Sequence, residues 1–200
     1  SGAVVYDLLT DVNLAGTTTV ASLTVTGDID VDGTSNLDVI DVDGAANFAA
    51  DVTFADGADI ITATAGTSNF RAGVNAGNSI ESGGNYNVVV GDEAGTAITT
   101  GDNNVGVGYN SLAANTTGSN NAGVGRQSLL SNTTGASNSA FGSTALDANT
   151  TGDYNTALGQ ASLSANTTAD NNTGVGYRAL AVNTTGTFNT AVGNNAGDAI

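Results

Sequence analysis

The second half of this 200-residue chain repeats a 17-residue unit, without slippage, from Asn87 to Ile200. Two of the repeats read NVGVGYNSLAANTTGSN, from Asn104, and NTALGQASLSANTTADN, from Asn155. A fixed period of this kind is the sequence signature of a repeat architecture. The unit is too short for a pair of helices, and its apolar residues lack helical spacing. The period therefore predicts a β-solenoid, in which each unit forms one coil of two short strands and two turns.

Two positions of each unit are apolar, and we expect both to lie inside the coil. The first, directly before a recurring glycine, holds Val90, Val107, Val124, Phe141, Leu158, Val175 and Val192. The second lies five residues later and holds Leu112, Leu129, Leu146, Leu163 and Leu180. Equivalent residues would stack about 4.8 Å apart, valine over valine, leucine over leucine and asparagine over asparagine. The Asn-Thr-Thr-Gly stretch that follows is typical of a turn, because asparagine and glycine tolerate the left-handed region.

The core predicted for a single coil is thin. Each unit offers one valine-like residue, one leucine and an alanine or two, against the conformational entropy lost in ordering the whole unit. Small residues in the strand positions would let neighbouring chains approach closely. We therefore expect several chains to share one core, and we predict a parallel homotrimer.

The composition excludes several classes of function. The chain carries 19 acidic and three basic residues, which give a formal net charge of −16. This acidity disfavours nucleic acid and anionic membrane surfaces, which attract lysine and arginine, and no apolar run is long enough to span a bilayer. Without histidine, cysteine or lysine, the chain cannot assemble a Ser-His triad, a thiolate nucleophile, a Schiff base or a zinc site. We expect a protein that is not an enzyme and binds no cofactor.

Changes in pattern divide the chain into four segments. Residues 1–15 are predicted to be an N-terminal attachment segment. Residues 16–62, in which apolar residues alternate with aspartates between glycine turns, are predicted to be an acidic β-rich shaft. Residues 63–86 form a transition, with an irregular first rung from about residue 69, and residues 87–200 form the solenoid. Because the sequence begins without methionine and stops within a repeat, we expect it to be part of a longer fibre.

Two details of the transition carry their own expectations. Gly83 and Gly84 are predicted to absorb the one residue by which the first unit exceeds the others. Arg71 is expected to be a solvated surface side chain rather than a partner of Glu81 or of a neighbouring chain.

Two groups of acidic residues have both a site interpretation and a structural one. Asp28–Gly33 imitates the start of an EF-hand loop, but Val39 stands where the loop needs a bidentate glutamate. An alternating strand with a glycine turn explains this segment better. Glu81, Asp92 and Glu93 are the acids nearest the junction, and nothing marks them as a pair for glycoside hydrolysis. No catalytic or metal-binding residue is therefore assigned, and no ligand-binding residue can be named.

The NTT motif also has several interpretations. It matches the N-glycosylation acceptor pattern at Asn115, Asn132, Asn149, Asn166 and Asn183. The threonines that follow would form a ladder similar to the threonine arrays of ice-binding solenoids: Thr116, Thr133, Thr150, Thr167 and Thr184. A turn at one corner of the coil explains the same residues, and we favour it over both alternatives.

The repeats resemble those of known fibrous proteins. NTALGQASL at Asn155–Leu163 and NTAVGNNAG at Asn189–Gly197 resemble the head repeats of YadA-type trimeric adhesins, whose Asn-x-x-Val/Ile-Gly-x-x-Ala/Ser-x units form trimeric left-handed β-rolls. The 17-residue NTTG variety, preceded by the alternation over Ser22–Val39, resembles tail-fibre and related virion fibre proteins of bacteriophages. The repeat resemblance covers about residues 69–200, and that of the shaft, about residues 16–62, is compositional. Adhesin head repeats are usually shorter than these.

These resemblances imply a structural component of a trimeric virion fibre, a phage tail or capsid fibre that projects outward and supports attachment to the host surface. The implied location is the virion, outside the cell. The implied partners are two further copies of the chain, other virion or filament proteins at the chain ends, and a host cell-surface receptor, without nucleic acid or membrane insertion. A bacterial trimeric adhesin or extracellular filament subunit is the alternative, and an ice-binding solenoid is a third hypothesis.

Overall fold

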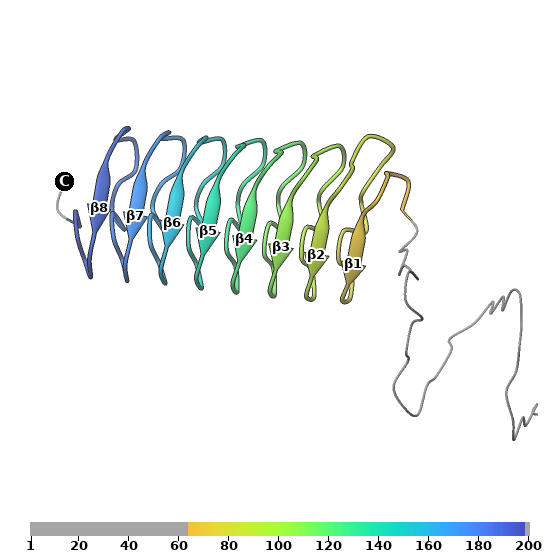
Figure 1. The fold of residues 1–200 in the computed structure, drawn as a ribbon, viewed down its shortest axis with the longest axis horizontal. Helices are drawn as coiled ribbons and strands as arrows, with labels where there is room; N and C mark the ends of the chain where they lie inside the picture. Colours follow the sequence, from red (N-terminus) through yellow and green to blue (C-terminus); the bar gives the residue numbers. More distant parts are fainter. Residues whose placement is uncertain (1–63, 199–200) are drawn as a thin grey trace, which may run out of the picture. The chain divides into compact units, whose positions relative to one another are not determined.

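A computed structural model of the chain describes residues 64–198. In this region eight short strands lie side by side in one parallel sheet, in the order of the sequence (Figure 1). The strands are β1 (Phe70–Ala72), β2 (Val88–Val90), β3 (Val105–Val107), β4 (Ala122–Val124), β5 (Ser139–Phe141), β6 (Thr156–Leu158), β7 (Thr173–Val175) and β8 (Thr190–Val192). Residues 64–198 contain no helix that could cross a membrane. The predicted β-solenoid is confirmed, whereas the segments 1–15 and 16–62 lie outside the described residues.

Each strand pairs with the strand one repeat later, so the sequence period is the length of one coil. From β2 onward the pairing follows the repeat without deviation, and Val88 of β2 lies opposite Val105 of β3. Between β1 and β2 the offset is one residue longer, because Phe70 lies opposite Val88. Each described coil contains one three-residue strand instead of the two predicted, and the rest of the coil is turns.

Residues in the left-handed region turn the chain at the corners of each coil. In the coil that starts at Asn104, the residues Asn110, Leu112 and Asn120 have φ angles of 56°, 54° and 61°. A strand needs consecutive residues in the β region, and these corners and the NTTG turn leave only one such run per coil. The backbone at the corners still bonds to neighbouring coils: the N–H of Asn120 donates to the carbonyl oxygen of Asp102 at 2.9 Å.

The recurring glycine after each strand lies where successive coils approach most closely. Gly108 has a φ of 128°, and a Cβ atom there would lie 2.6 Å from the carbonyl oxygen of Gly125 in the next coil. Gly125 meets Gly142 in the same way, at 2.5 Å. Any side chain at this position would push two coils apart, which explains why each unit has glycine there.

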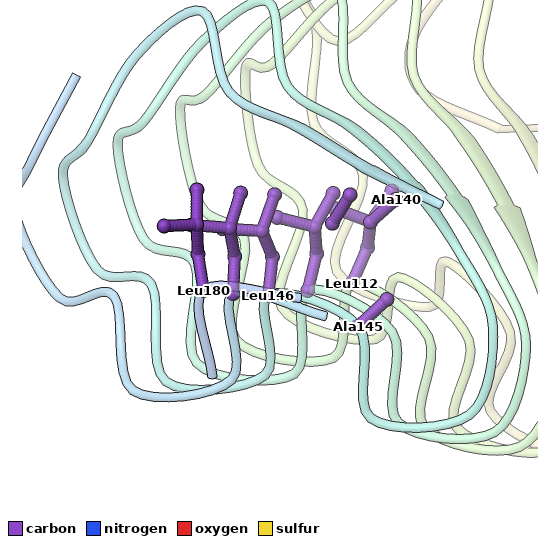
Figure 2. Packing of buried hydrophobic residues seen from close by; sticks show 8 residues of the cluster. Leu112, Ala140, Ala145, Leu146 and Leu180 are labelled. Carbon is purple, nitrogen blue, oxygen red and sulfur yellow. The ribbon is translucent and has the colours of Figure 1, made fainter. Parts of the chain in front are cut away.

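A column of leucines fills the interior of five coils. Leu112, Leu129, Leu146, Leu163 and Leu180 are completely buried and stack one above the other (Figure 2). All five have φ angles of 52–54°, a region that bulky side chains normally avoid. Burying each side chain stabilises the fold by about 1.5–3 kcal/mol, which offsets a conformational cost of about 1–2 kcal/mol. The predicted inward leucine column is confirmed.

The other apolar column, predicted to lie inside, points outward. In each strand the middle residue faces the core and its two neighbours face away, so Ala140 is fully buried while Phe141 and Leu158 are 43% and 49% exposed. From β3 onward the middle residue is small because the interior is already filled: a Cβ atom on Gly123 would lie 2.8 Å from the Oγ of Ser111. The bulky residue therefore takes the outer side, and the prediction that valine stacks on valine inside is wrong.

Two columns of asparagine side chains run through the coils. The first column begins each repeat: Asn69, Asn87, Asn104, Asn121, Asn138, Asn155, Asn172 and Asn189. In it, the Nδ2 of Asn104 donates to the Oδ1 of Asn87 at 3.0 Å and to the carbonyl oxygen of Gly118 at 2.9 Å. The backbone N–H of Asn104 donates to the same Oδ1 at 2.9 Å. Each buried amide thus acts as donor and acceptor at once, as a fully satisfied polar network requires.

The second asparagine column belongs to the NTT turns. The Nδ2 of Asn132 donates to the Oδ1 of Asn115 at 2.7 Å and to the carbonyl oxygen of Gly135 at 2.9 Å. The threonine after each asparagine is bonded as well, since the Oγ1 of Thr133 donates to the carbonyl oxygen of Thr150 at 2.9 Å. The NTTG corner therefore holds successive coils together and is more than a solvated turn.

The first two coils have a different interior. Where later coils have leucine and asparagine, the second coil has Gly95 and Ile98. A Cβ atom on Gly95 would lie 2.7 Å from the Cδ1 of Ile98 and 2.6 Å from the Cγ1 of Val89. Isoleucine and valine thus occupy the space that leucine fills elsewhere, and the two kinds of coil form two separate apolar clusters.

The first coil is one residue longer and has an arginine at its inward strand position. The N–H of Glu81 donates to the carbonyl oxygen of Thr99 at 2.9 Å. The Nδ2 of Asn69 donates to the carbonyl oxygen of Gly84 at 2.8 Å, as later asparagines do to the equivalent glycine. Glu81 thus pairs with a residue that lies 18 positions later, whereas Gly84 already follows the regular repeat. The extra residue hence lies between Glu81 and Gly84. Arg71 is half-buried, and its Nη1 donates to the carbonyl oxygen of Gly77 at 3.0 Å, so the expectation of a solvated surface arginine is wrong.

Asp147 is poorly accommodated by its coil, and this leads to a pH-dependent prediction. Burial raises the pKa of its carboxyl above the usual 3.8, against hydrogen bonds from the backbone at Asp147 and Ala148 that lower it. Its Oδ1 is buried without a hydrogen-bond partner. An acid with a raised pKa in the folded state destabilises the fold as the pH rises from 3.8 through that raised pKa. We expect Asp147→Ser, which introduces the residue found one coil later at Ser164, to raise Tm by a few degrees at neutral pH.

The pH profile separates this effect from a simple gain in packing. Thermal unfolding followed by circular dichroism should show little difference between Asp147→Ser and the original chain below pH 3.8, where both states are protonated. A gain in Tm of the same size at neutral pH and below pH 3.8 would show that the charge of Asp147 is not the cause of the gain.

Candidate interaction surface

The outer face of the sheet carries two columns of side chains, one from each end of every strand. The last strand residues are Ala72, Val90, Val107, Val124, Phe141, Leu158, Val175 and Val192. The first strand residues are Phe70, Val88, Val105, Ala122, Ser139, Thr156, Thr173 and Thr190. None of these side chains carries a charge. Because β1 to β8 stand side by side (Figure 1), the two columns form one continuous surface, which we call the outer sheet face.

The outer sheet face is uncharged and accessible, and its column of last strand residues is apolar in every strand, whereas the column of first strand residues is hydroxyl-bearing from β5 to β8. Exposed fractions are 37% for Val88, 38% for Val105, 43% for Phe141 and 49% for Leu158. Single exposed apolar residues are normal on protein surfaces, but a continuous row of them is typical of an interaction site. The lack of charge is informative in a chain with a formal net charge of −16. The outer sheet face is therefore the candidate interaction surface of the described residues.

The acids considered as a catalytic pair do not come together in one site. Asp92 and Glu93 bond to one corner of the preceding coil: an Asp92 carboxylate oxygen accepts from the N–H of Val74 at 3.2 Å, and a Glu93 oxygen accepts from the Nδ2 of Asn75 at 2.7 Å. Glu81 lies in a different turn, next to Thr99. Within residues 64–198 no three acidic side chains lie close enough to hold a metal ion. Asp28–Gly33 falls outside the described residues.

The NTT residues have structural partners. The acceptor asparagines Asn115, Asn132, Asn149 and Asn166 are completely buried, and their amide nitrogens are engaged in the column described above. In the ladder that begins at Thr116, the side chains are half-buried and donate to backbone carbonyls as far as Thr167, and the last member, Thr184, is exposed. The exposed threonine column lies one residue later: Thr100, Thr117, Thr134, Thr151, Thr168 and Thr185. The residues considered for ice binding are thus not those that the coil presents to solvent.

No protein-family model matches the chain, and no curated protein or solved structure matches it. Its function has to be inferred from the residues and their geometry.

A shallow pocket lies beside the last NTTG turn. It is lined by Val182, Asn183, Thr184, Thr185, Gly186 and Asn189. In the preceding repeats the equivalent atoms are covered by the next coil. The pocket is therefore part of the stacking surface between coils and does not point to a ligand.

Sequence reasoning missed the outer sheet face, although one signal for it was present. The middle strand position holds Gly106, Gly123, Ala140, Ala157 and Gly174. A small residue at one position, followed in every repeat by a large apolar one, indicates that the small residue faces a filled interior. The sequence prediction took the small residue as a place where another backbone comes close, and it therefore assigned the larger residue to the core. The structure contradicts that assignment.

Proposed function

We propose that this chain is a structural subunit of a parallel trimeric fibre of a phage virion, which projects outward and supports attachment to a host surface. The observation that carries the proposal is the outer sheet face, an uncharged surface with at least one apolar side chain on every described coil. The chain has no histidine, cysteine or lysine, which agrees with a structural rather than an enzymatic role. The likeness of the repeats to phage fibre and adhesin repeats supplies the biological setting.

A second copy of the chain is the partner that matches the outer sheet face best. Side chains in each column recur with the strand spacing, about 4.8 Å. A partner can cover the whole row only if it presents apolar groups at the same interval. Parallel copies of the chain do so because their strands have the same spacing. A globular partner would match it over a few strands only. Three copies around one axis would bury Phe141 and Leu158 and leave the polar turns in solvent.

The charge distribution favours the same arrangement. A chain with a formal net charge of −16 repels its own copies. Association is therefore least costly through a face that carries no acid, and all the side chains of the outer sheet face meet that requirement. The thin core of each single coil, one leucine and small residues, gains apolar burial in this way.

We expect the full chain to have the mass of three copies in light scattering and Leu158→Asp to have the mass of one. The variant places a carboxylate on the outer sheet face, where each copy would meet the same charge on the others. Val182→Asp is the matched control, because Val182 is 46% exposed, close to the 49% of Leu158, but lies outside the sheet. A folded monomer for the original chain, or an equal effect of both substitutions, would contradict the trimer.

The viral and cellular settings are separated by the neighbouring genes. Virion assembly genes next to the coding sequence support a phage fibre. A gene or segment that anchors the protein in a bacterial outer membrane supports the alternative, a trimeric adhesin or extracellular filament subunit.

A further inference from the structure

The last residue of each coil lies in the left-handed region, and three of these residues are aromatic. The last residues of the coils, all with φ angles of 57–61°, are Tyr86, Asn103, Asn120, Ser137, Tyr154, Asn171 and Phe188. Asparagine suits this region because its short polar side chain can bond locally. An aromatic residue there is a genuine conformational outlier. The three aromatic residues therefore occupy positions for which the other coils use better-suited residues.

Packing does not explain these aromatic residues. Tyr86, Tyr154 and Phe188 are 59%, 64% and 78% exposed. The leucines inside the coils also have positive φ, but their cost is offset by complete burial. No such compensation exists for an exposed ring. The stacked coils impose a positive φ at other corners as well, for example at Gln127 and Thr144, so what distinguishes these three corners is the exposed aromatic ring itself.

Two of the three aromatic corners lie two coils apart on the same edge of the solenoid. Asn171 stacks on the corner that contains Tyr154, since its N–H donates to the carbonyl oxygen of Asp153 at 3.0 Å. Phe188 stacks on the next corner in the same way, with its N–H 3.3 Å from the carbonyl oxygen of Asp170. Tyr154 and Phe188 are thus two coils apart, a distance of about 10 Å. The exposed amide of Asn171 lies between them.

Carboxylates line the same edge in the neighbouring column. The Oδ1 of Asp170 accepts from the N–H of Asp153 at 2.7 Å. Asp153 supports the coil below in the same way, with its Oδ1 2.7 Å from the N–H of Ala136. Both side chains are only half-buried, so their remaining acceptor capacity faces solvent beside the rings.

We infer that Tyr154, Asn171 and Phe188 form a binding site for a neutral, extended glycan. The electron-rich face of an aromatic ring packs against the apolar C–H face of a sugar ring. The amide of Asn171 and the carboxylates of Asp153 and Asp170 can bond sugar hydroxyl groups. The spacing of the rings is comparable to the length of a disaccharide unit in an extended chain. The carboxylates and the net charge of −16 repel an acidic glycan.

This inference deepens the proposed attachment role and relies on it only for the biological setting. It also predicts a weaker copy of the site at the other end of the solenoid. Tyr86 is followed one coil later by Asp102 and Asn103, as Tyr154 is followed by Asp170 and Asn171. The next coil has Asn120 in place of Phe188, so this copy offers one ring instead of two.

The test is calorimetric titration of the full chain with hexasaccharides of β-linked glucose, mannose and N-acetylglucosamine, and with hexagalacturonate as the acidic probe. The double variant Tyr154→Asn with Phe188→Asn introduces the residue that other coils carry at the same corner. It should bind at least one neutral hexasaccharide roughly tenfold or more weakly than the original chain. Its Tm should be equal or higher, because asparagine relieves the left-handed strain. Tyr109→Asn is the matched control, since Tyr109 is 51% exposed away from this edge and its φ is not positive.

Several outcomes would overturn the site. They are the absence of binding to every neutral hexasaccharide, binding of hexagalacturonate alone, or equal binding by the double variant and the original chain. Light scattering of the same samples keeps this test separate from the proposed fibre. A monomeric original chain that binds the glycan would refute the trimer alone, whereas a trimeric chain that binds none would refute the glycan site alone. Loss of the trimer in the double variant would assign the rings to the chain interface instead.

Discussion

Asn138→Asp is expected to destabilise the solenoid by about 3 kcal/mol or more at neutral pH, although the two side chains have nearly the same shape. The Nδ2 of Asn138 donates to the carbonyl oxygen of Gly152 at 2.8 Å and to the Oδ1 of Asn121 at 3.2 Å. A carboxylate would place a charged oxygen against both acceptors in a site with no exposure. Urea unfolding at a fixed chain concentration measures the loss.

The pH dependence identifies the cause of that loss. A protonated aspartic acid can donate to the carbonyl oxygen of Gly152, so the fold would raise the pKa of the introduced side chain. The penalty should therefore be smallest below the unfolded pKa of about 3.9 and should grow as the pH rises through the raised folded value. Asn120→Asp makes the same chemical change at an exposed corner and should cost little. If both variants unfold at the same urea concentration, the buried amide column does not determine the stability of the coils.

Leu146→Ala is the second substitution with a large expected effect, about 3 kcal/mol. Leu146 is completely buried between Leu129 and Leu163, and each neighbour is held in place by its own coil (Figure 2). The structure can therefore collapse only partly around the missing atoms. Alanine leaves the left-handed φ of 52° in place, so the loss reports packing and not backbone strain.

Leu130→Ala is the control for this substitution. Leu130 is half-buried, and the equivalent position already holds alanine in two other coils, Ala113 and Ala181. Its replacement should change the free energy of unfolding by less than about 1 kcal/mol. Equal losses for Leu130→Ala and Leu146→Ala in urea unfolding would refute the leucine column as the core.

The period of the repeat was sufficient to predict the architecture, because one coil per repeat is the only way to align equivalent residues in columns. The leucine column and the stacking of asparagines followed from it, whereas the close approach of successive coils at the recurring glycine was not predicted. The number of strands per coil did not follow from the period either, since the left-handed φ of Asn110 or Leu112 is set by the stacked coils and not by local preference.

The orientation of the strand residues was the main error of the sequence interpretation. A three-residue strand such as Val105–Val107 is too short for alternation to reveal which side faces the core. Which residue is inward depends on how much space the leucine column leaves. The aromatic corners were missed for a related reason: Tyr154 and Phe188 are two full repeats apart in the sequence and come within about 10 Å of each other only when the coils stack.

The stacked columns of side chains find their hydrogen-bond partners in the coils above and below, and this has a consequence for evolution. From the third coil onward, the asparagines of the two columns, the first threonine of each NTT turn and the recurring glycine each interact with the next repeat, through partners that are chemically the same from one coil to the next. Deleting or duplicating one unit by recombination would therefore rejoin compatible surfaces and leave no unpaired amide. Fibre length could change in increments of about 4.8 Å without any new stabilising mutation. Such a gene could lengthen or shorten its product within a single replication error while the protein remains foldable.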